Sequence, residues 1–337
     1  MMTLLELRQT AQEGAQEELA AQAQIIQLKQ ERTKGGKPYF DLELADATAR
    51  TRLKIWADSE AFGFLESASM GDGVELTGFF HVNDYGLNVN RPVLRALDAE
   101  EKELLFVGSP ERKEKSDQDW QFLKETFSSL KDARLRLATL AALEKYEKKW
   151  RRAGAARTYH HARRGGLLEH TAQMLRCAAA LAPLYPEIFP DLLYAGVLFH
   201  DIGKLWENDY EEAGFVSPYS RTGEMMGHIC IGVELVNQLW KEAKEGNADL
   251  FETAHPPSDL VRDHLLHLIV SHHGQMEFGA PVTPRTPEAW MLHYIDNLDA
   301  TTEMLRCTYA EKQQASPGLF EARRPLTGLA VLPLSRF

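Results

Sequence analysis

Apolar and polar residues alternate in short runs along the first third of this 337-residue chain. Phe40, Leu42 and Leu44 alternate with acidic residues, and glycines interrupt the sequence between successive runs. A period of two is typical of strands with one buried face, and glycines are typical of the turns between strands. Five such strands with one helical insert at "SEAFGFLES" predict a Greek-key β-barrel of the OB type over residues 20–98.

The pattern changes twice more along the chain. Residues 1–19 are rich in Ala, Gln and Glu and predict a polar helix or a frayed extension, to which we assign no function. Residues 99–119 are highly charged and contain a Ser-Pro break, which predicts a linker. Apolar residues at helical spacing then recur through residues 120–314, ahead of a tail at 315–337. The expected fold class is therefore a multidomain α and β chain, with an N-terminal OB-type barrel followed by an all-α domain.

Composition narrows the class of protein. The longest apolar runs fall short of the roughly 20 residues that a membrane span needs, and the N-terminus lacks the basic-then-apolar order of a secretory signal. Three widely separated cysteines fit a reducing compartment and exclude a cysteine-based zinc knuckle. We therefore expect a cytoplasmic protein with no membrane partner. The net charge of -11 argues against a surface uniformly adapted to nucleic acid.

Local charge is more informative than the total. The segment 145–164, "KYEKKWRRAGAARTYHHARR", contains eight Lys or Arg and a single acidic residue. It fits either a solvated helix face or a phosphate-attracting rim beside an active site. In the predicted barrel, Lys37, Trp56 and Tyr85 are candidate contacts to a single strand, since aromatic rings and cations bind bases and phosphates. Each of the three also fits the core or an ordinary surface.

Histidines are concentrated in the second half of the chain, where eleven of the twelve lie between His160 and His293. Five helical segments each present a metal-type ligand on the face expected to be buried. Any one of them fits a hydrogen-bonded core histidine or a capping aspartate. Burying all of them without a cation would be costly, and such nitrogen and oxygen ligands suit Mn²⁺, Fe, Zn²⁺ or Mg²⁺. The candidate ligands are His170, His200, Asp201, His228, His272 and Asp296.

This order of ligands, with the context "HDIGK", resembles the HD superfamily of metal-dependent phosphohydrolases. The resemblance implies that His170, His200, Asp201 and Asp296 hold one metal. The additional histidines resemble the two-metal form of the superfamily, with His273 replacing or supplementing His272. The implied cofactors are two divalent ions, with Mn²⁺ as the first choice and Fe, Zn²⁺ or Mg²⁺ as alternatives.

Over roughly residues 20–325 the chain resembles the YhaM family of 3′-to-5′ exoribonucleases. The resemblance rests on the predicted barrel ahead of the HD motif and on "YHHARRGGLLEHT", "LLYAGVLFHDIGK", "GEMMGHI", "SHHGQMEFGAPVTP" and "HYIDNLDA". It implies that a single strand of RNA, and also DNA as a second substrate, is shortened from its 3′ end to 5′-mononucleotides. The N-terminal extension and the acidic segment "EGNADLFETAHPPSD" depart from the family pattern.

Two-metal phosphodiester hydrolysis predicts roles for individual residues. In our hypothesis Asp201 bridges the two metals, and Lys204, three residues later, contacts the scissile phosphate or orients the bridging group. Lys204 also fits a surface lysine at a helix end. His161, with Arg163 and Arg164, precedes the first ligand and would contact phosphates or protonate the leaving oxygen. Asn297 and Asp299 fit either partners that orient the ligands or an inert helix surface.

Three alternatives remain. The first is an HD nucleotidase or a cyclic-nucleotide phosphodiesterase, in which the barrel mediates only contacts within a homo-oligomer. The related cyclic-dinucleotide subclass is disfavoured, because its Gly-Tyr-Pro signature is missing from "HHGQMEFGAP". The second is a non-catalytic strand-binding adaptor with a structural metal. The third is a metal-dependent oxygenase with the same fold.

Overall fold

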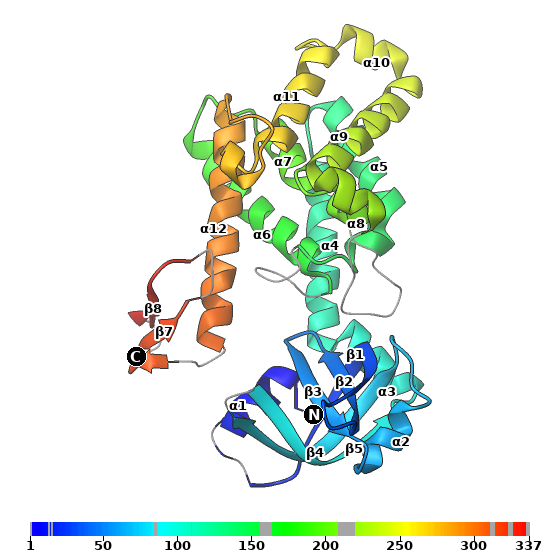
Figure 1. The fold of residues 1–337 in the computed structure, drawn as a ribbon. Coiled ribbons are helices and arrows are strands. Elements are labelled where there is room, and N and C mark those ends of the chain that lie inside the picture. Colours follow the sequence, from blue (N-terminus) through cyan, green and yellow to red (C-terminus); the bar gives the residue numbers. More distant parts are fainter. Residues whose placement is uncertain are drawn as a thin grey trace.

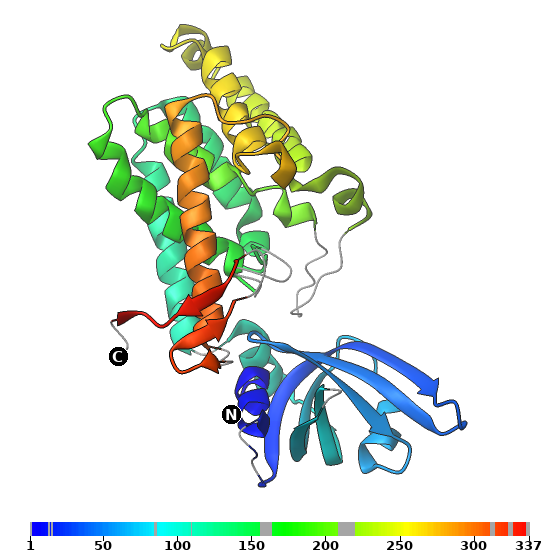
Figure 2. The ribbon, with the colours of Figure 1, turned by 60° about the vertical axis from the view of Figure 1, so that its left-hand side comes forward.

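A computed structural model describes residues 2–12, 14, 16–83, 86–108, 110–155, 164–207, 220–310, 314–322 and 326–334. A five-stranded sheet lies at one end of the molecule, and a bundle of helices forms the other (Figures 1 and 2). Each part has its own apolar core. The two-part organisation therefore follows the change of pattern in the sequence, from alternating residues to helical spacing.

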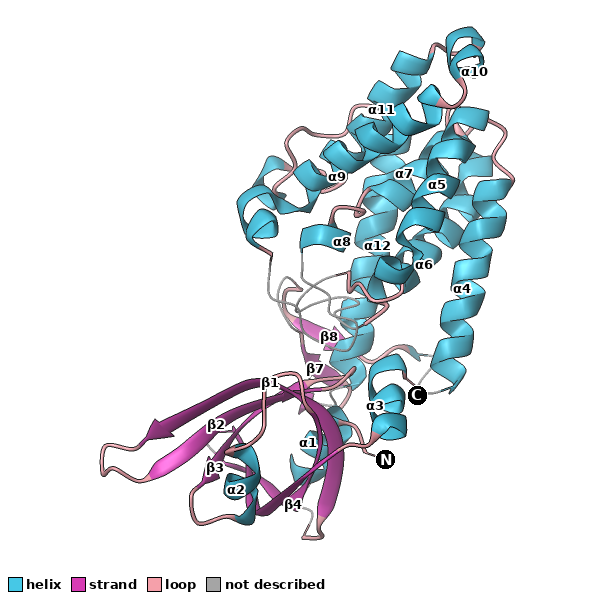
Figure 3. Cartoon of the chain, turned by 90° about the vertical axis from the view of Figure 1, so that its right-hand side faces the viewer, coloured by secondary structure: helices cyan, strands magenta, loops and turns pink. Residues whose placement is uncertain are grey.

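The sheet is antiparallel throughout and has the order β3-β2-β1-β4-β5. Its long first strand pairs with β4 through residues 19–24 and with β2 through residues 24–32, so the sheet curls around it (Figure 3). The antiparallel sheet is confirmed. The closed barrel remains a prediction, because no ladder between β3 and β5 joins the edges among the described residues. The elements are β1 (Leu19–Arg32), β2 (Pro38–Ala45), β3 (Arg50–Trp56), α2 (Glu60–Leu65), β4 (Gly73–Asn83) and β5 (Gly86–Ala96).

The N-terminal helix α1 (Leu4–Gln12) is part of the sheet core. Leu4 and Leu7 are buried against the strands, and the Leu4 amide donates a hydrogen bond of 2.7 Å to Oδ2 of Asp46. The Gln9 side chain donates to the carbonyl of Ala310, at the end of the helical part. A polar or frayed extension was expected here, but two buried leucines one turn apart anchor the helix.

The second part of the chain is helical, as predicted. Residues 99–119, expected as a linker, form α3 and the start of α4, and a reciprocal capping box between Asp98 and Glu101 begins α3. Trp150, Phe127 and Phe199 are buried in the core of the bundle. The helices are α3 (Ala99–Val107), α4 (Pro110–Ser128), α5 (Ala133–Trp150), α6 (Gly166–Leu181), α7 (Pro190–Phe199), α8 (Lys204–Glu207), α9 (Arg221–Glu245), α10 (Ala248–Thr253), α11 (Ser258–Ser271) and α12 (Pro287–Ala310), with 3₁₀ turns η1 (Ala182–Leu184) and η2 (Met276–Phe278).

A small three-stranded sheet follows the bundle, with the order β6-β7-β8. Its strands are β6 (Gln314–Ser316), β7 (Leu319–Glu321) and β8 (Leu329–Val331), and they lie beside the C-terminal end of α12 (Figure 2). The Tyr309 ring packs edge-on against Phe320, and its hydroxyl donates a hydrogen bond of 2.9 Å to the Val331 carbonyl. No described helix combines the length and apolar character needed to cross a lipid bilayer.

Candidate metal centre

The apolar helix α7 ends at the His-Asp pair, which lies at the centre of the bundle. Pro190 begins the helix, and all its residues from Ala195 to Phe199 are buried. His200 and Asp201 follow directly and are themselves 0% and 3% exposed. Charged or polar groups at this depth require partners, because an unpaired buried charge is destabilising. Those partners come from α6, α8, α9, α11 and α12.

A first group of candidate ligands comes from α6, the end of α7 and α12. Single nitrogen or oxygen atoms of His170, His200 and Asp296 all lie within 4.8 Å of one another. The Nε2 atom of His170 is 3.3 Å from Oδ1 of Asp296, and Nε2 of His200 is 3.2 Å from Oδ2 of Asp201. Two imidazoles and two carboxylates therefore converge on one point.

A second group lies on the other side of Asp201. Its members are His228 of α9, His272 at the end of α11 and the adjacent His273, whose ligand atoms lie within 4.8 Å of one another. The Oδ1 atom of Asp201 is 3.4 Å from Nε2 of His228 and 3.7 Å from Nε2 of His272. Asp201 thus presents one carboxylate oxygen to each group. His272 and His273 both belong to the second group, so this arrangement is compatible with His273 supplementing His272, and the choice between the two stays a prediction.

The Nδ1 atoms of these histidines are engaged elsewhere, which directs each Nε2 toward the centre. Backbone carbonyls of Val197, Ile269 and Phe278 lie 2.8, 2.7 and 2.7 Å from Nδ1 of His200, His272 and His273. Carboxylates serve the other two: Asp299 lies 2.7 Å from Nδ1 of His170, and Glu207 lies 3.2 Å from Nδ1 of His228. Such partners fix the tautomer and raise the basicity of metal-binding imidazoles.

The unsatisfied atoms fit a cation. Within the described residues, Nε2 of His200, Nε2 of His228 and Oδ1 of Asp201 are buried and have no hydrogen-bond partner. Buried polar atoms in folded proteins are otherwise nearly always satisfied. Imidazole nitrogens and carboxylate oxygens are ligands for Mn²⁺, Fe and Zn²⁺, and the donor set contains no thiolate. The residues present therefore fit a metal centre.

Local charges support this interpretation. Burial disfavours ionised Asp201, but the nearby Lys204 ammonium and the His200 imidazole outweigh it and hold the carboxyl pKa well below its usual value. Burial likewise favours neutral His170, but hydrogen bonds with Asp296 and Asp299 outweigh burial and raise the pKa of His170 to about 9. The carboxylates of the first group therefore stabilise a positive charge at the position of the His170 ring.

Lys204 lies at the edge of the centre. Its Nζ atom is 2.6 Å from Oδ2 of Asp201, and its side chain is 13% exposed. Burial alone would lower the Lys204 pKa, but the Asp201 carboxylate raises it, so the group stays charged. The ammonium thus lies beside the carboxylate that the two groups share.

Two glycines allow α9 to approach the His-Asp turn. A Cβ atom on Gly203 would lie 1.9 Å from the His228 carbonyl oxygen, so only glycine fits. Gly227 has φ 67°, a left-handed conformation that places a kink in α9 directly before His228. The kink leaves the His228 amide free to donate a hydrogen bond of 3.0 Å to Glu207. Sequence reasoning missed Glu207; an acid six residues after the His-Asp pair was the only available signal.

Three more of the predicted site residues are described by the structure, and none of them belongs to either group of candidate ligands. Arg164 lines a pocket at the start of α6. Lys37 directly precedes β2 and Trp56 ends β3, and the Lys37 ammonium lies 5.4 Å from the Trp56 ring centroid. Tyr85, His161 and Arg163 lie outside the described residues. Asp299, which fitted either of two roles, is buried and contacts the ligand His170. Asn297 instead contacts His293, whose Nδ1 lies 2.7 Å from the His272 carbonyl.

Fold and site together define a metal-dependent phosphohydrolase of the HD class, and the HD domain family matches residues 167–301. The chain belongs to the family of the 3′-5′ exoribonuclease YhaM. It is 33% identical to that protein of Bacillus licheniformis, over 86% of this chain and 88% of the relative. It is 34% identical to the Bacillus subtilis protein over 80% and 81%, and 31% identical to the Listeria welshimeri protein over 86% of each. The family assignment made from the motifs is confirmed.

Proposed function

We propose that this protein shortens single-stranded RNA from its 3′ end, releasing 5′-mononucleotides, and that two groups of residues on either side of Asp201 would hold two divalent cations. The position of the Asp201 carboxylate carries the proposal, because its two oxygens face two separate groups of ligands. The curated relatives are 3′-5′ exoribonucleases, and the similarity extends across most of the chain.

The chain's own residues would position the substrate around this centre. His170, His200 and Asp296 would hold one ion, and His228, His272 and His273 the other. When bound, such ions activate water and neutralise charge on the phosphoryl oxygens. Lys204, held 2.6 Å from Asp201, would keep the shared carboxylate oriented and add positive charge where a phosphate enters. We expect Mn²⁺ as the native ion.

The sheet would bind the strand ahead of the centre, as an OB-type barrel does. Tyr39 and Trp56 are paired neighbours on β2 and β3, with ring centroids 5.2 Å apart. Lys37 and Lys54 each lie 5.4 Å from one of these rings, and Trp56 is 37% exposed. Tyr39 is half-buried beside the exposed Trp56. An aromatic pair flanked by cations suits bases and phosphates, and such stacking is tolerant of sequence. DNA is a second candidate substrate, and the site of action would be the cytoplasm.

A cleavage assay tests the proposal. Single-stranded RNA and DNA, labelled at the 5′ end, are incubated with Mn²⁺, Mg²⁺ or chelator, and the products are separated by length. We expect a ladder that shortens stepwise with Mn²⁺, no cleavage with chelator, and loss of activity in Asp201→Asn. Asp249→Asn, at an exposed position on α10, is the matched control. Intact RNA together with hydrolysis of mononucleotides would instead establish a nucleotidase.

The number and identity of the ions are measured separately. Elemental analysis of the purified protein should give two ions per chain. Substituting His273 by Ala should remove one of them and leave the first group loaded. One ion in the wild type, unchanged by this substitution, would contradict the two-ion assignment. Strand binding with no cleavage under any metal condition would favour the adaptor.

A further inference from the structure

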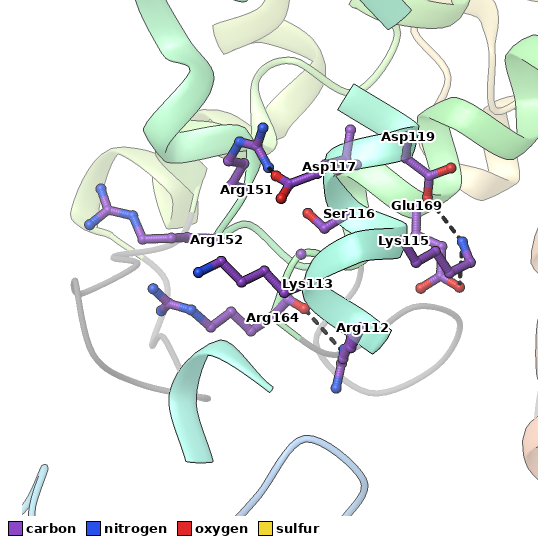
Figure 4. Close-up of a pocket in the computed structure, with 12 residues that line it drawn as sticks. Arg112, Lys113, Lys115, Ser116, Asp117, Asp119, Arg151, Arg152, Arg164 and Glu169 are labelled. Atoms are coloured by element: carbon purple, nitrogen blue, oxygen red, sulfur yellow. Dashed lines mark hydrogen bonds and ion pairs between the residues drawn. The ribbon is translucent and has the colours of Figure 1, made fainter. Parts of the chain in front are cut away.

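A pocket of about 370 Å³ opens at the start of α6, separate from the metal ligands. Three elements of the helical part line it: the first turns of α4, the end of α5 and the first residues of α6 (Figure 4). We call it the α4–α6 pocket. The chain enters the bundle here from the sheet, since α4 follows the short helix α3 that leaves β5. The pocket therefore lies at the junction of the two parts.

Cationic side chains dominate the lining. Six Lys or Arg residues line the pocket, against three acidic residues. The acids lie close to cations of the same pocket: Asp117 is 2.7 Å from Arg151, and Asp119 is 2.9 Å from Lys115. Counted over the lining alone, cations outnumber acids six to three, and a net positive lining attracts ligands of negative charge. The cations are Arg112, Lys113, Lys115, Arg151, Arg152 and Arg164.

Backbone dipoles add to this charge. Gly165 lines the pocket and is the N-cap of α6, in a left-handed conformation with φ 75°. The sixteen-residue helix α6 therefore directs its positive end toward the pocket. A helix N-terminus together with several Arg and Lys residues is the chemistry that binds phosphate groups.

The same helix connects the pocket to the metal centre. His170 follows Gly165 by five residues, which is about 7.5 Å along an α-helix. A strand whose 3′ end lies at the centre would thus bring an upstream phosphate to the pocket within a few nucleotides. Arg164, with its predicted substrate contact, lies in the pocket and not at the metal ligands.

We propose that the α4–α6 pocket binds a backbone phosphate of the RNA strand a few nucleotides upstream of the scissile bond. This inference rests on the proposed exonuclease function. The pocket holds the strand in register while the 3′-terminal residue lies at Asp201. The phosphate of a free nucleotide has the same chemistry, so the experiment must distinguish the two sources.

Binding without turnover is the first measurement. A fluorescent single-stranded 20-mer is titrated in chelator at several salt concentrations, with the wild type, Lys113→Glu and Arg164→Gln. We expect binding about tenfold weaker in both variants and a salt dependence reduced by about one released ion. Lys113 is exposed, so its substitution should not disturb folding. Lys124→Glu, also exposed and eleven residues later on α4, is the matched control and should bind as the wild type does.

Hydrolysis separates the pocket from the metal centre. With Mn²⁺, Lys113→Glu should hydrolyse bis(p-nitrophenyl) phosphate and a dinucleotide as the wild type does, while its KM for the 20-mer rises about tenfold. A wild type that hydrolyses none of these substrates would refute the proposed function itself. Equal RNA affinity, salt dependence and KM in Lys113→Glu and Lys124→Glu, with an active wild type, would overturn the pocket proposal alone. If Lys113→Glu lost 5′-AMP binding but bound RNA normally, the pocket would be assigned to a free nucleotide. This result would also overturn the pocket proposal.

Discussion

Oδ2 of Asp299 lies 2.7 Å from Nδ1 of His170, and both side chains are buried. Asp299 comes one turn after the candidate ligand Asp296 on α12, so one helix supplies both a candidate ligand and a carboxylate that contacts another candidate ligand. The contact orients the His170 ring so that its Nε2 faces Asp296, 3.3 Å away. We therefore propose that Asp299 is a positioning residue of the candidate metal centre.

The first prediction follows from this contact. Asp299→Asn keeps the size of the side chain but removes the charge that supports the His170 imidazole. We expect metal affinity to fall about 10- to 100-fold, the range typical of partners that orient ligands. Competition with a fluorescent chelator for Mn²⁺ measures the change. Asp259→Asn, whose side chain is 81% exposed on α11, should bind metal normally. Wild-type affinity in Asp299→Asn would show that the contact does not support the ligand.

The second prediction concerns the packing of Gly203. In Gly203→Ala, the new methyl group would lie 1.9 Å from the His228 carbonyl oxygen and 2.8 Å from the Gly232 nitrogen, so α9 must move. His228 would then leave its position near Asp201, and elemental analysis should detect one ion fewer per chain. Gly63→Ala in α2 is the control, because its Cβ would meet nothing within 4 Å. A full metal content in Gly203→Ala would show that α9 tolerates the shift.

The third prediction is a proton released on metal binding. His170 has a pKa of about 9 in the metal-free centre, so it carries a proton at neutral pH that a metal must displace. Burial tends to raise the pKa of Asp296, but its contact with His170 outweighs burial and lowers this pKa. Burial also lowers the pKa of His272 well below its usual value. Neither group therefore releases a further proton when a metal binds. Apparent affinity should therefore rise about tenfold per pH unit up to about pH 9 and then level off.

Calorimetry measures this release. Titrations with Mn²⁺ at pH 7.5 in two buffers of different ionisation enthalpy should differ by the heat of about one proton per first ion bound. Equal heats in the two buffers would mean that His170 is already neutral. The same comparison on Asp299→Asn should show a smaller difference, because loss of this carboxylate removes one of the hydrogen bonds that raise the His170 pKa.

Periodicity predicted both parts of the fold, for physical reasons visible in particular residues. Thr51, Leu53 and Ile55 are buried on β3 and alternate with exposed neighbours, so the sequence shows a period of two there. The six candidate ligands could be predicted from the sequence, because each lies at helical spacing from the apolar residues on the buried face of its segment. The partners that orient these side chains could not all be predicted from the sequence. Two of them are the backbone carbonyls of Val197 and Ile269, and a backbone carbonyl does not depend on the residue type. Some of the residues that line the α4–α6 pocket are more than 50 positions apart in the sequence, so no local sequence pattern predicts the pocket.

The N-terminal helix shows the limit of composition as a guide. Residues 1–19 were expected to be polar or frayed because Ala, Gln and Glu dominate them. The two leucines at positions 4 and 7 are nevertheless only 2% and 1% exposed. A few apolar side chains at helical spacing are enough to dock a short helix, provided that a complementary sheet surface exists, and that surface is set by distant strands.

The fourth prediction tests this docking. Leu7→Ala leaves a cavity between α1 and the sheet, and a buried Leu→Ala change typically costs about 2–5 kcal/mol. We therefore expect the free energy of unfolding of the sheet to fall by about 2–4 kcal/mol. Urea denaturation followed by the fluorescence of Trp56 and the other tryptophans, with hydrogen exchange of β1 amides to assign the transition, measures the loss. Arg8→Ala, at an exposed position on the same helix, should be nearly neutral. Equal stability of the two variants would mean that α1 contributes nothing to the sheet core.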